Sequence, residues 1–387
     1  MKRAVLGELC DFFNGGAWSD KEYVNAGIPV LKVTNCKSTG FQLDGLNYLS
    51  EKSREKYKKN ELVIGDVIIA TVGSHPNLIE SAAGRSCIVN SQVEGFYLNQ
   101  NAVCVRTKDK KVLSQKYLGY LCKCADFQHY IQSRGRGAAN QMRIAISSIK
   151  EYSFTLPDIQ NQNYIADILS AYDDLIENNQ KQIKLLEEAD RRLYKEWFVD
   201  LRFPGHENTK IVDGVPEGWN RTNINEILTF HRGYDLTKNE MKAGRYPVVG
   251  STTVIGYHNE FKIKGPGIVT GRSGSLGKYQ FIWDNFWPHN TSLYISDYKD
   301  HNIFFVYSLL QTVDFASLNN GGAIPTLNRN VLSNIEVIEP TDELQEMFAK
   351  IAEPQYQKIK NLEKQNDRLK TARDLLLPKL MSGEVEV

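Results

Sequence analysis

The chain has 387 residues, of which 41% are hydrophobic and 24% are charged, and its formal net charge is +1. This length allows two or three domains, and the composition is ordinary for a soluble globular protein. The charge excludes a globally basic nucleic-acid-binding protein, so any DNA contact must come from local clusters. The longest apolar run, residues 303–310, is too short to cross a bilayer, and we expect neither a signal peptide nor membrane contact.

The cysteines are scattered through the first third of the chain, at Cys10, Cys36, Cys87, Cys104, Cys122 and Cys124. None of them forms a C-x-x-C pair, so the pattern favours a reducing compartment over disulfides or a zinc site. We therefore expect buried free thiols and a cytoplasmic location.

The first globular part, residues 1–157, is mostly β in its pattern. Short apolar runs bounded by turn-forming residues predict strands at 28–33, 62–72, 87–89 and 102–105. An amphipathic stretch predicts a helix over 112–133, and a glycine- and arginine-rich segment, 133–143, follows it.

A long helix is predicted next, at about 159–198, where apolar residues recur with helical spacing. With Ile165 at heptad position a, the other a positions are Tyr172, Asn179, Leu186 and Leu193, and the d positions include Ile168, Leu175 and Ala189. Each long helix would extend about 60 Å and carry one apolar stripe, so it needs a partner helix along its length.

The rest of the chain repeats this order. A linker at 206–218 precedes predicted strands at 246–249, 267–270, 280–283 and 291–296 and a helix at 303–310. A second long helix is predicted at about 342–381, with Pro378 expected to end or kink it.

Short matches show that this repetition is a tandem duplication. The two long helices correspond without a gap at an offset of 183 residues, and Pro157 corresponds to Pro340 at the same offset. The globular parts match at 218 for residues 28–30 and 246–248, at 201 for 73–74 and 274–275, and at 189 for 100–101 and 289–290. The offset decreases in one direction because the second globular part is shorter.

The predicted fold is α+β, with two β-rich globular domains separated by two long helices that form an antiparallel coiled coil with pseudo-two-fold internal symmetry. The predicted segments are a first domain at 1–157, a first helix at 158–203, a linker and second domain at 204–340, and a second helix with the C-terminal tail at 341–387.

Catalytic and metal-binding signatures are not found in this sequence. Residues 272–279 resemble a phosphate-binding loop, but its first glycine is displaced and Tyr279 replaces the required serine or threonine. The sequence contains neither a G-x-S-x-G elbow nor the Asp-Pro-Pro-Tyr type of motif of an amino-methyltransferase, and the histidines form no metal-ligand pattern. We therefore predict that the chain is not an enzyme by itself and holds no metal.

Repeated loops provide the binding candidates. Small residues let a backbone approach a phosphate closely, arginine can bind phosphate or guanine, and asparagine and glutamine suit adenine. The alternative is that such segments are only turns. The candidate DNA-contacting residues are Lys32, Thr34, Asn35, Ser74, Arg134, Arg136, Asn140, Gln141 and Arg143 in the first part, and Arg232, Tyr234, Arg272, Ser273, Ser275, Asn290, Asn319, Asn320, Thr326, Asn328 and Arg329 in the second.

Several strings resemble the specificity subunits of type I restriction–modification systems. The most specific is RDLLLPKLMSGE at 373–384, and the others are VPEGW at 215–219, IQNQN at 159–163, YPVVGS at 246–251 and GRSGS at 271–275. The resemblance covers essentially the full length. It departs from the pattern in the first domain, where residues 73–76 read Gly-Ser-His-Pro.

The resemblance implies a double-stranded-DNA-reading subunit whose two target recognition domains each read half of a bipartite sequence. It also implies partners, namely two methyltransferase subunits and restriction subunits with translocase and nuclease activity. S-adenosylmethionine, ATP and Mg²⁺ are expected in those partners and no cofactor in this chain. Apolar residues beyond the helix seam could dock a methyltransferase or could pack on the recognition domains, and they are Tyr194, Trp197, Phe198, Leu375 and Leu377.

Two rival interpretations remain open from sequence. One is a coiled-coil adaptor whose globular ends bind other proteins and have no role with DNA. The other is a single-chain nuclease or methyltransferase, against which the missing motifs count.

Overall fold

The computed structural model describes residues 2–37, 40–74, 83–137, 142–272, 277–313 and 335–385. The chain divides into two compact units, of which unit 1 comprises residues 1–178 and 365–387 and unit 2 comprises residues 179–364. Each unit therefore combines one globular part with a segment of each long helix. The division proposed from sequence differs, because it treats each long helix as one undivided segment.

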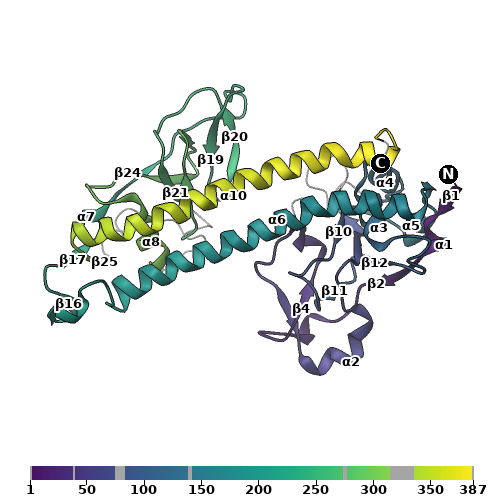
Figure 1. Cartoon of the computed structure of the whole chain (residues 1–387), viewed down its shortest axis with the longest axis horizontal. Helices are drawn as coiled ribbons and strands as arrows, with labels where there is room; N and C mark the ends of the chain where they lie inside the picture. Colours follow the sequence, from purple (N-terminus) through teal and green to yellow (C-terminus); the bar gives the residue numbers. More distant parts are fainter. Residues whose placement is uncertain are drawn as a thin grey trace. The chain divides into compact units, whose positions relative to one another are not determined.

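Two long helices dominate the α content (Figure 1). Helix α6 (Ile159–Tyr194) has 36 residues and continues into a π-helical turn at Lys195–Val199. Helix α10 (Asp342–Ser382) has 41 residues. Helix α10 continues four residues past Pro378, so this proline does not end the helix, the first of the two predicted effects. Within each unit the segments of α6 and α10 share one hydrophobic core, so the predicted pairing and α+β fold class are confirmed.

Burial along both helices confirms the offset of 183 but corrects the heptad register. The predicted a column is retained, since Ile165 is 5% exposed and its equivalent Phe348 is fully buried. The second buried column lies one residue later than predicted, because Leu169 is 0% exposed while Leu175 is 39% exposed. The second helix shows the same shift, with Ala352 buried and Ile351 exposed.

Unit 1 contains the elements of the first globular part. In chain order they are β1 (Lys2–Val5), α1 (Leu6–Leu9), β2 (Cys10–Asn14), β3 (Tyr23–Val24), β4 (Ile28–Leu31), β5 (Cys36–Lys37), β6 (Gly40–Phe41), β7 (Asn47–Leu49), α2 (Arg54–Tyr57), β8 (Val67–Ala70), β9 (Val72–Gly73), β10 (Ser86–Ile88), β11 (Tyr97–Leu98), β12 (Ala102–Thr107), α3 (Gln115–Lys123), α4 (Ala125–Ser133), β13 (Met142–Arg143), α5 (Ile146–Lys150) and β14 (Ser153–Leu156). The predicted single helix over 112–133 is instead two helices, because Cys124 has an extended backbone and separates α3 from α4.

Unit 2 contains the elements of the second globular part. They are β15 (Ile211–Val212), β16 (Val215–Pro216), β17 (Asn220–Asn223), α7 (Ile224–Ile227), β18 (Thr229–Arg232), β19 (Tyr246–Val249), β20 (Val254–His258), β21 (Gly267–Gly271), β22 (Tyr279–Ile282), β23 (Trp287–Pro288), β24 (Ser292–Asp297), α8 (Ile303–Thr312) and β25 (Glu336–Glu339). The four strands and the helix predicted between 246 and 310 all appear within a residue or two of their expected bounds.

The sheets of the two units share their main strand order, although β3 of unit 1 is an additional strand. The four-stranded sheet β10-β8-β12-β2 of unit 1 corresponds to β22-β21-β24-β18 of unit 2. In the second sheet, β11 is parallel to β4 as β23 is parallel to β19. The strand pair β1–β14 corresponds to β17–β25. This shared strand order supports the internal duplication independently of the sequence matches.

The core of each unit joins its globular part to the long helices. In unit 1, Ile165 and Leu169 of α6 and Leu380 of α10 pack with the buried residues of α3, α4 and the β10-β8-β12-β2 sheet. In unit 2, Phe348 of α10 packs with Phe198 and with Phe305 of α8. Each globular part is thus fixed to both helices by buried apolar surface, which is the main stabilising contribution in such cores.

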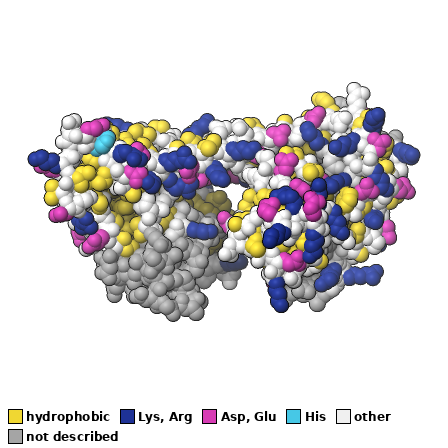
Figure 2. All heavy atoms as spheres, turned by 90° about the horizontal axis from the view of Figure 1, so that it is seen from below, with side chains coloured by type: hydrophobic (Ala, Val, Ile, Leu, Met, Phe, Trp, Pro, Cys, Tyr) yellow, Lys and Arg dark blue, Asp and Glu magenta, His cyan; other side chains and the backbone are white. Residues whose placement is uncertain are grey.

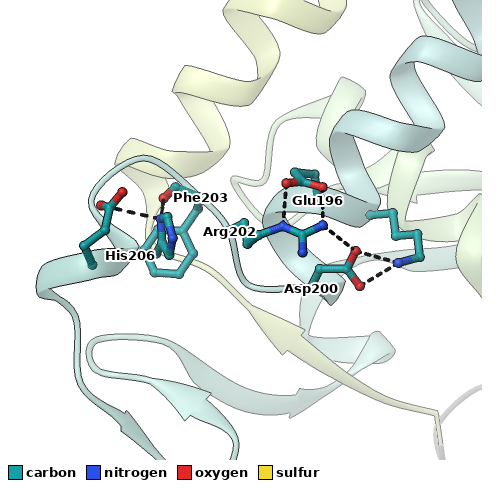
Figure 3. A network of polar contacts seen from close by, with 7 residues as sticks. Glu196, Asp200, Arg202, Phe203 and His206 are labelled. Atoms are coloured by element: carbon teal, nitrogen blue, oxygen red, sulfur yellow. Dashed lines mark hydrogen bonds and ion pairs between the residues drawn. The ribbon is translucent and has the colours of Figure 1, made fainter.

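The chain leaves α6 through a turn held by charged side chains (Figure 3). Arg202 donates two hydrogen bonds to Glu196, at 2.5 and 2.6 Å, and Lys195 contacts Asp200 at 2.6 Å. Leu201, between these groups, has a positive φ of 57°. The network therefore holds an unfavourable backbone turn at the entry to the second globular part.

The six cysteines are all free and buried, as expected from their scattered spacing. Among the described residues, no helix has both the length and the apolar content that a membrane span requires.

Candidate nucleic-acid interface

Two predicted binding segments of unit 1 meet at a short strand pair. Strand β13 pairs with β9, so that Arg143 lies opposite Val72 and Ser74 follows the pair directly. Arg136 and Arg143 exchange two backbone hydrogen bonds of 2.9 Å. The structure therefore brings the Gly-Ser loop at 71–74 together with the arginine-rich segment at 134–143.

The three arginines of this surface present their side chains to solvent. Arg134, Arg136 and Arg143 are all exposed, and the guanidinium of Arg134 lies 5.2 Å from the ring centre of Tyr130. In the part of the chain that the structure describes, none of these three guanidinium groups forms an ion pair. They remain able to bind an external anion such as a phosphate. We call these three residues the arginine cluster.

A glycine makes this arrangement possible. A Cβ atom on Gly135 would lie 2.2 Å from Sδ of Met142, far inside van der Waals contact. The close passage of residues 134–136 over β13 therefore depends on the missing side chain. Asn140 and Gln141, predicted from the same segment, lie outside the described residues.

The remaining described candidates of unit 1 are Lys32, Thr34 and Asn35, and their side chains differ in burial and in hydrogen bonding. The side chain of Asn35 is 9% exposed, accepts a hydrogen bond from the backbone of Lys32 at 2.9 Å and donates one to the carbonyl of Gln42 at 2.9 Å. Asn35 thus has a structural role, contrary to the predicted DNA contact. Lys32 donates to Asn47 at 2.8 Å and lies over the ring of Tyr23, whereas Thr34 is exposed.

The candidates of unit 2 gather where β18, β21 and the turn before β24 meet. Arg232 on β18 contacts Asp235 at 3.6 Å, and Asn290 donates a hydrogen bond to the same carboxylate. The backbone N–H of Arg272 donates to the carbonyl of Thr291 at 3.1 Å. Arg232, Arg272 and Asn290 are therefore brought together, and Asp235 adds an acceptor that sequence reasoning missed.

The other candidates of unit 2 are less accessible or not described. Tyr234 is half-buried, with its hydroxyl 3.0 Å from that of Tyr294 and its ring facing Lys262. The predicted candidates Ser273, Ser275, Asn319, Asn320, Thr326, Asn328 and Arg329 lie outside the described residues.

Backbone hydrogen bonds place the two sets of loops at the same position of the repeat. Thr71 N–H donates to the carbonyl of Asn101 as Arg272 N–H donates to that of Thr291. This confirms the offset of 201 for the Gly-Ser loops but changes the offset of the following segment from 189 to 190. Asn290 therefore corresponds to Gln100, an exposed residue that sequence reasoning missed because the match was one residue out of register.

The predicted partner-docking residues divide into two groups. Tyr194, Trp197 and Phe198 are only 3–7% exposed and pack in the core of unit 2, so packing, the alternative left open by sequence, accounts for them. Leu375 is 62% exposed on α10, while Leu377 is half-buried against the core of unit 1.

Charged side chains of both signs are interspersed over the face shown in Figure 2. This agrees with a formal net charge of +1. A net charge this close to zero gives little long-range attraction for a polyanion, so any anion binding depends on local groups such as the arginine cluster.

Two copies of one β-rich domain, each fixed to a pair of long helices and each carrying polar loops at equivalent positions, define a duplicated recognition protein. The family model for the type I restriction modification DNA specificity domain matches residues 1–188 and 216–371. The chain belongs to this family and is the DNA specificity subunit of a type I restriction–modification system.

Curated relatives and a solved structure are consistent with this assignment. The chain is 27% identical over 302 residues to the type I restriction enzyme MjaIX specificity subunit of Methanocaldococcus jannaschii, covering 70% of this chain and 69% of that one. It is 21% identical to the HindI specificity subunit of Haemophilus influenzae, with 96% of each chain covered. Its fold is similar to the crystal structure of the type I system S subunit from M. genitalium, with a TM-score of 0.60, 20% identity, and 98% and 95% of the two chains covered.

Proposed function

We propose that each globular part reads one half of a bipartite double-stranded DNA sequence. The observation that carries this proposal is the anchoring of the loops after Thr71 and after Arg272. The same backbone hydrogen bond holds both loops to the same sheet position, although their side chains differ. One scaffold that presents two different sets of side chains is what recognition of two unlike half-sites requires.

The chemistry of the two loop sets differs in a way that suits different base edges. The arginine cluster of unit 1 offers only donors, which favour phosphate oxygens and guanine. In unit 2, Arg232, Asp235 and Asn290 combine donors with a carboxylate acceptor in one contact network. Amide and carboxylate groups can discriminate adenine and cytosine edges. The two half-sites are therefore expected to differ in composition.

The long helices set the spacing between half-sites in this proposal and carry the methyltransferase subunits. Equivalent exposed apolar residues support two docking positions. Tyr164 of α6 is 53% exposed, and Met347 of α10, at the offset of 183, is 42% exposed. Side chains of this size left outside both cores are typical anchors for a partner. Leu375, in the segment of α10 that belongs to unit 1, is a further exposed apolar residue of this helix.

The chain has no catalytic role of its own in this proposal. Methylation would be carried out by the two methyltransferase subunits with S-adenosylmethionine, and translocation and cleavage by restriction subunits with ATP and Mg²⁺. The specificity subunit contributes only the choice of sequence and the distance between the two methylated positions.

A half-site-specific test uses the complex reconstituted with its methyltransferase and sequencing of the methylated sites. R136Q/R143Q should relax or change the base preference in one half-site, and R232Q/R272Q should do so in the other. R54Q/R221Q, which removes two arginines outside both loop sets, is the matched control.

The outcome that contradicts the proposal is a change in both half-sites from either variant, or in neither. The adaptor interpretation predicts that the complex shows no dependence on DNA sequence at all. A gel shift with random duplex in the presence of the methyltransferase distinguishes this case.

A further inference from the structure

A partly buried polar cluster interrupts the apolar seam between α6 and α10 in unit 1. Asp173 of α6 accepts a hydrogen bond from Tyr120 of α3 at 2.9 Å and another from Arg373 of α10. Lys123 lies 3.6 Å from the same carboxylate. The carboxylate on α6 is thus matched by a cation on α10.

A second cluster lies in the seam of unit 2. Asp190 of α6 is 1% exposed and accepts hydrogen bonds from Tyr356 of α10 at 2.6 Å and from Ser308 of α8 at 2.7 Å. Here the donors are neutral hydroxyl groups. Among the described residues, Oδ1 of Asp190 has no hydrogen-bond partner.

The two clusters are equivalent under the internal repeat, with the two long helices exchanged. Tyr356 is the equivalent of Asp173 at the offset of 183, and Arg373 is the equivalent of Asp190. The buried Gln162 and Gln345, which donate to the carbonyls of Pro157 and Pro340, confirm this alignment.

Both carboxylates lie on α6 and both facing donors lie on α10. In an exact duplication, the two helices would instead carry the same side chains at equivalent positions. The seam has therefore lost its symmetry at these two polar contacts, while the apolar columns retain it.

We propose that this division makes α6 select α10 as its partner and reject the α6 helix of a second copy of the chain. An antiparallel pairing of two α6 helices would place Asp173 of one copy opposite Asp190 of the other, at both ends of the contact. In such a pairing Arg373 is absent, and each site brings two carboxylates together with Lys123 as the remaining cation among the described neighbours, which is unfavourable.

The discrimination is one-sided. An antiparallel pairing of two α10 helices would place Tyr356 opposite Arg373, which brings no like charges together. The carboxylates on α6 therefore exclude only pairing through the first half of the chain. This is the registry role for which buried polar groups in coiled coils are best known.

The test uses the full chain and three variants. R373D places a second carboxylate beside Asp173, and the thermal midpoint should fall by roughly 10 °C, from the usual cost of breaking a buried ion pair. D173Y/R373D copies the arrangement of unit 2 into unit 1 and should recover most of that loss. D174Y/R368D makes the same substitutions at exposed positions of the two helices and should match the wild type.

The same double variant also tests the choice of partner. In D173Y/R373D each α6 carries a tyrosine opposite Asp190 of a second copy, so pairing between copies is no longer rejected. After unfolding and refolding at high concentration, light scattering should show a dimer for D173Y/R373D and unchanged mass for the wild type and D174Y/R368D.

Two results would overturn the proposal. One is a wild-type thermal midpoint for R373D, which would mean that the cluster does not constrain pairing. The other is a D173Y/R373D chain that recovers its stability but keeps the wild-type mass at every concentration, which would assign the choice of partner to other residues.

Discussion

The arginine cluster of unit 1 gives a quantitative prediction about DNA binding. Arg134, Arg136 and Arg143 are exposed and form no ion pair within the described residues. The variant R134Q/R136Q/R143Q keeps polar side chains of similar reach but removes three positive charges. If each guanidinium contacts one phosphate, the slope of log affinity against log salt should decrease by about 2.7, at roughly 0.9 per contact.

This slope converts into a measurable change in affinity. Between 50 and 200 mM salt, each lost contact removes a factor of about 3.5, so the salt-induced loss of affinity should be about 40-fold smaller for the triple variant than for the wild type. Fluorescence anisotropy of the methyltransferase complex on a labelled duplex, over a salt series, measures this quantity. Contacts to phosphate should be lost equally on cognate and unrelated DNA, whereas contacts to bases should be lost only on cognate DNA.

The matched control is R54Q/R221Q/R368Q, which removes the same charge from exposed positions outside the cluster. An unchanged slope in the triple variant would refute the assignment of this surface to DNA. An equal decrease in the control would show that net charge alone is responsible.

Four further predictions concern stability and spacing. Burial opposes ionisation of Asp173, but Lys123 and Arg373 outweigh it, so the pKa of Asp173 is lowered. The stabilising effect of this carboxylate is therefore present at neutral pH and is lost as the pH falls through the acidic range, so D173N should lower the thermal midpoint at pH 7 and progressively less as the pH is lowered. Burial raises the pKa of Asp190, so the contribution of this side chain to folding stability is most favourable at low pH and decreases as the pH rises. D190N should therefore be at least as stable as the wild type at pH 7 when unfolding is followed by calorimetry. A large loss of stability in D190N would contradict the raised pKa. F348A should lose about 3–5 kcal/mol in denaturant unfolding, because Phe348 is fully buried among aromatic rings, while M347A should change little. Removal of one heptad from each long helix shortens each by about 10 Å and should shorten the methylated spacer by roughly three base pairs; an unchanged spacer would exclude the helices as the separator.

The long helices show where sequence reasoning succeeded and where it stopped. Their existence, their pairing and the offset of 183 follow from apolar spacing alone. The second seam column did not, because Ile168 and Leu169 are both apolar, as are Leu175 and Ile176. Either column satisfies a heptad pattern, and only the direction in which each globular part and the partner helix pack selects Leu169 and Ile176.

The candidate interface shows the same limit. The repeat located both loop sets, but the match between Asn290 and Asn101 was chosen by residue identity. Hydrogen-bond register in the sheet pairs Asn290 with Gln100 instead. Similarly, Asn35 has the side chain of a base-reading residue, yet a local turn consumes both of its polar groups.

Periodicity and residue order along the chain are enough to establish the duplication, the α+β class, the two long helices and the absence of familiar catalytic motifs. Packing in three dimensions selects which apolar residues form the core, which remain on the surface, and which polar groups meet across the seam. Tyr194, Trp197 and Phe198 are buried while Tyr164 and Leu375 are exposed, although all five are large and apolar. The reason is that burial depends on neighbours distant in the chain. Phe198 packs against Phe348, and Tyr356 donates a hydrogen bond to Asp190, and no local sequence pattern encodes these contacts.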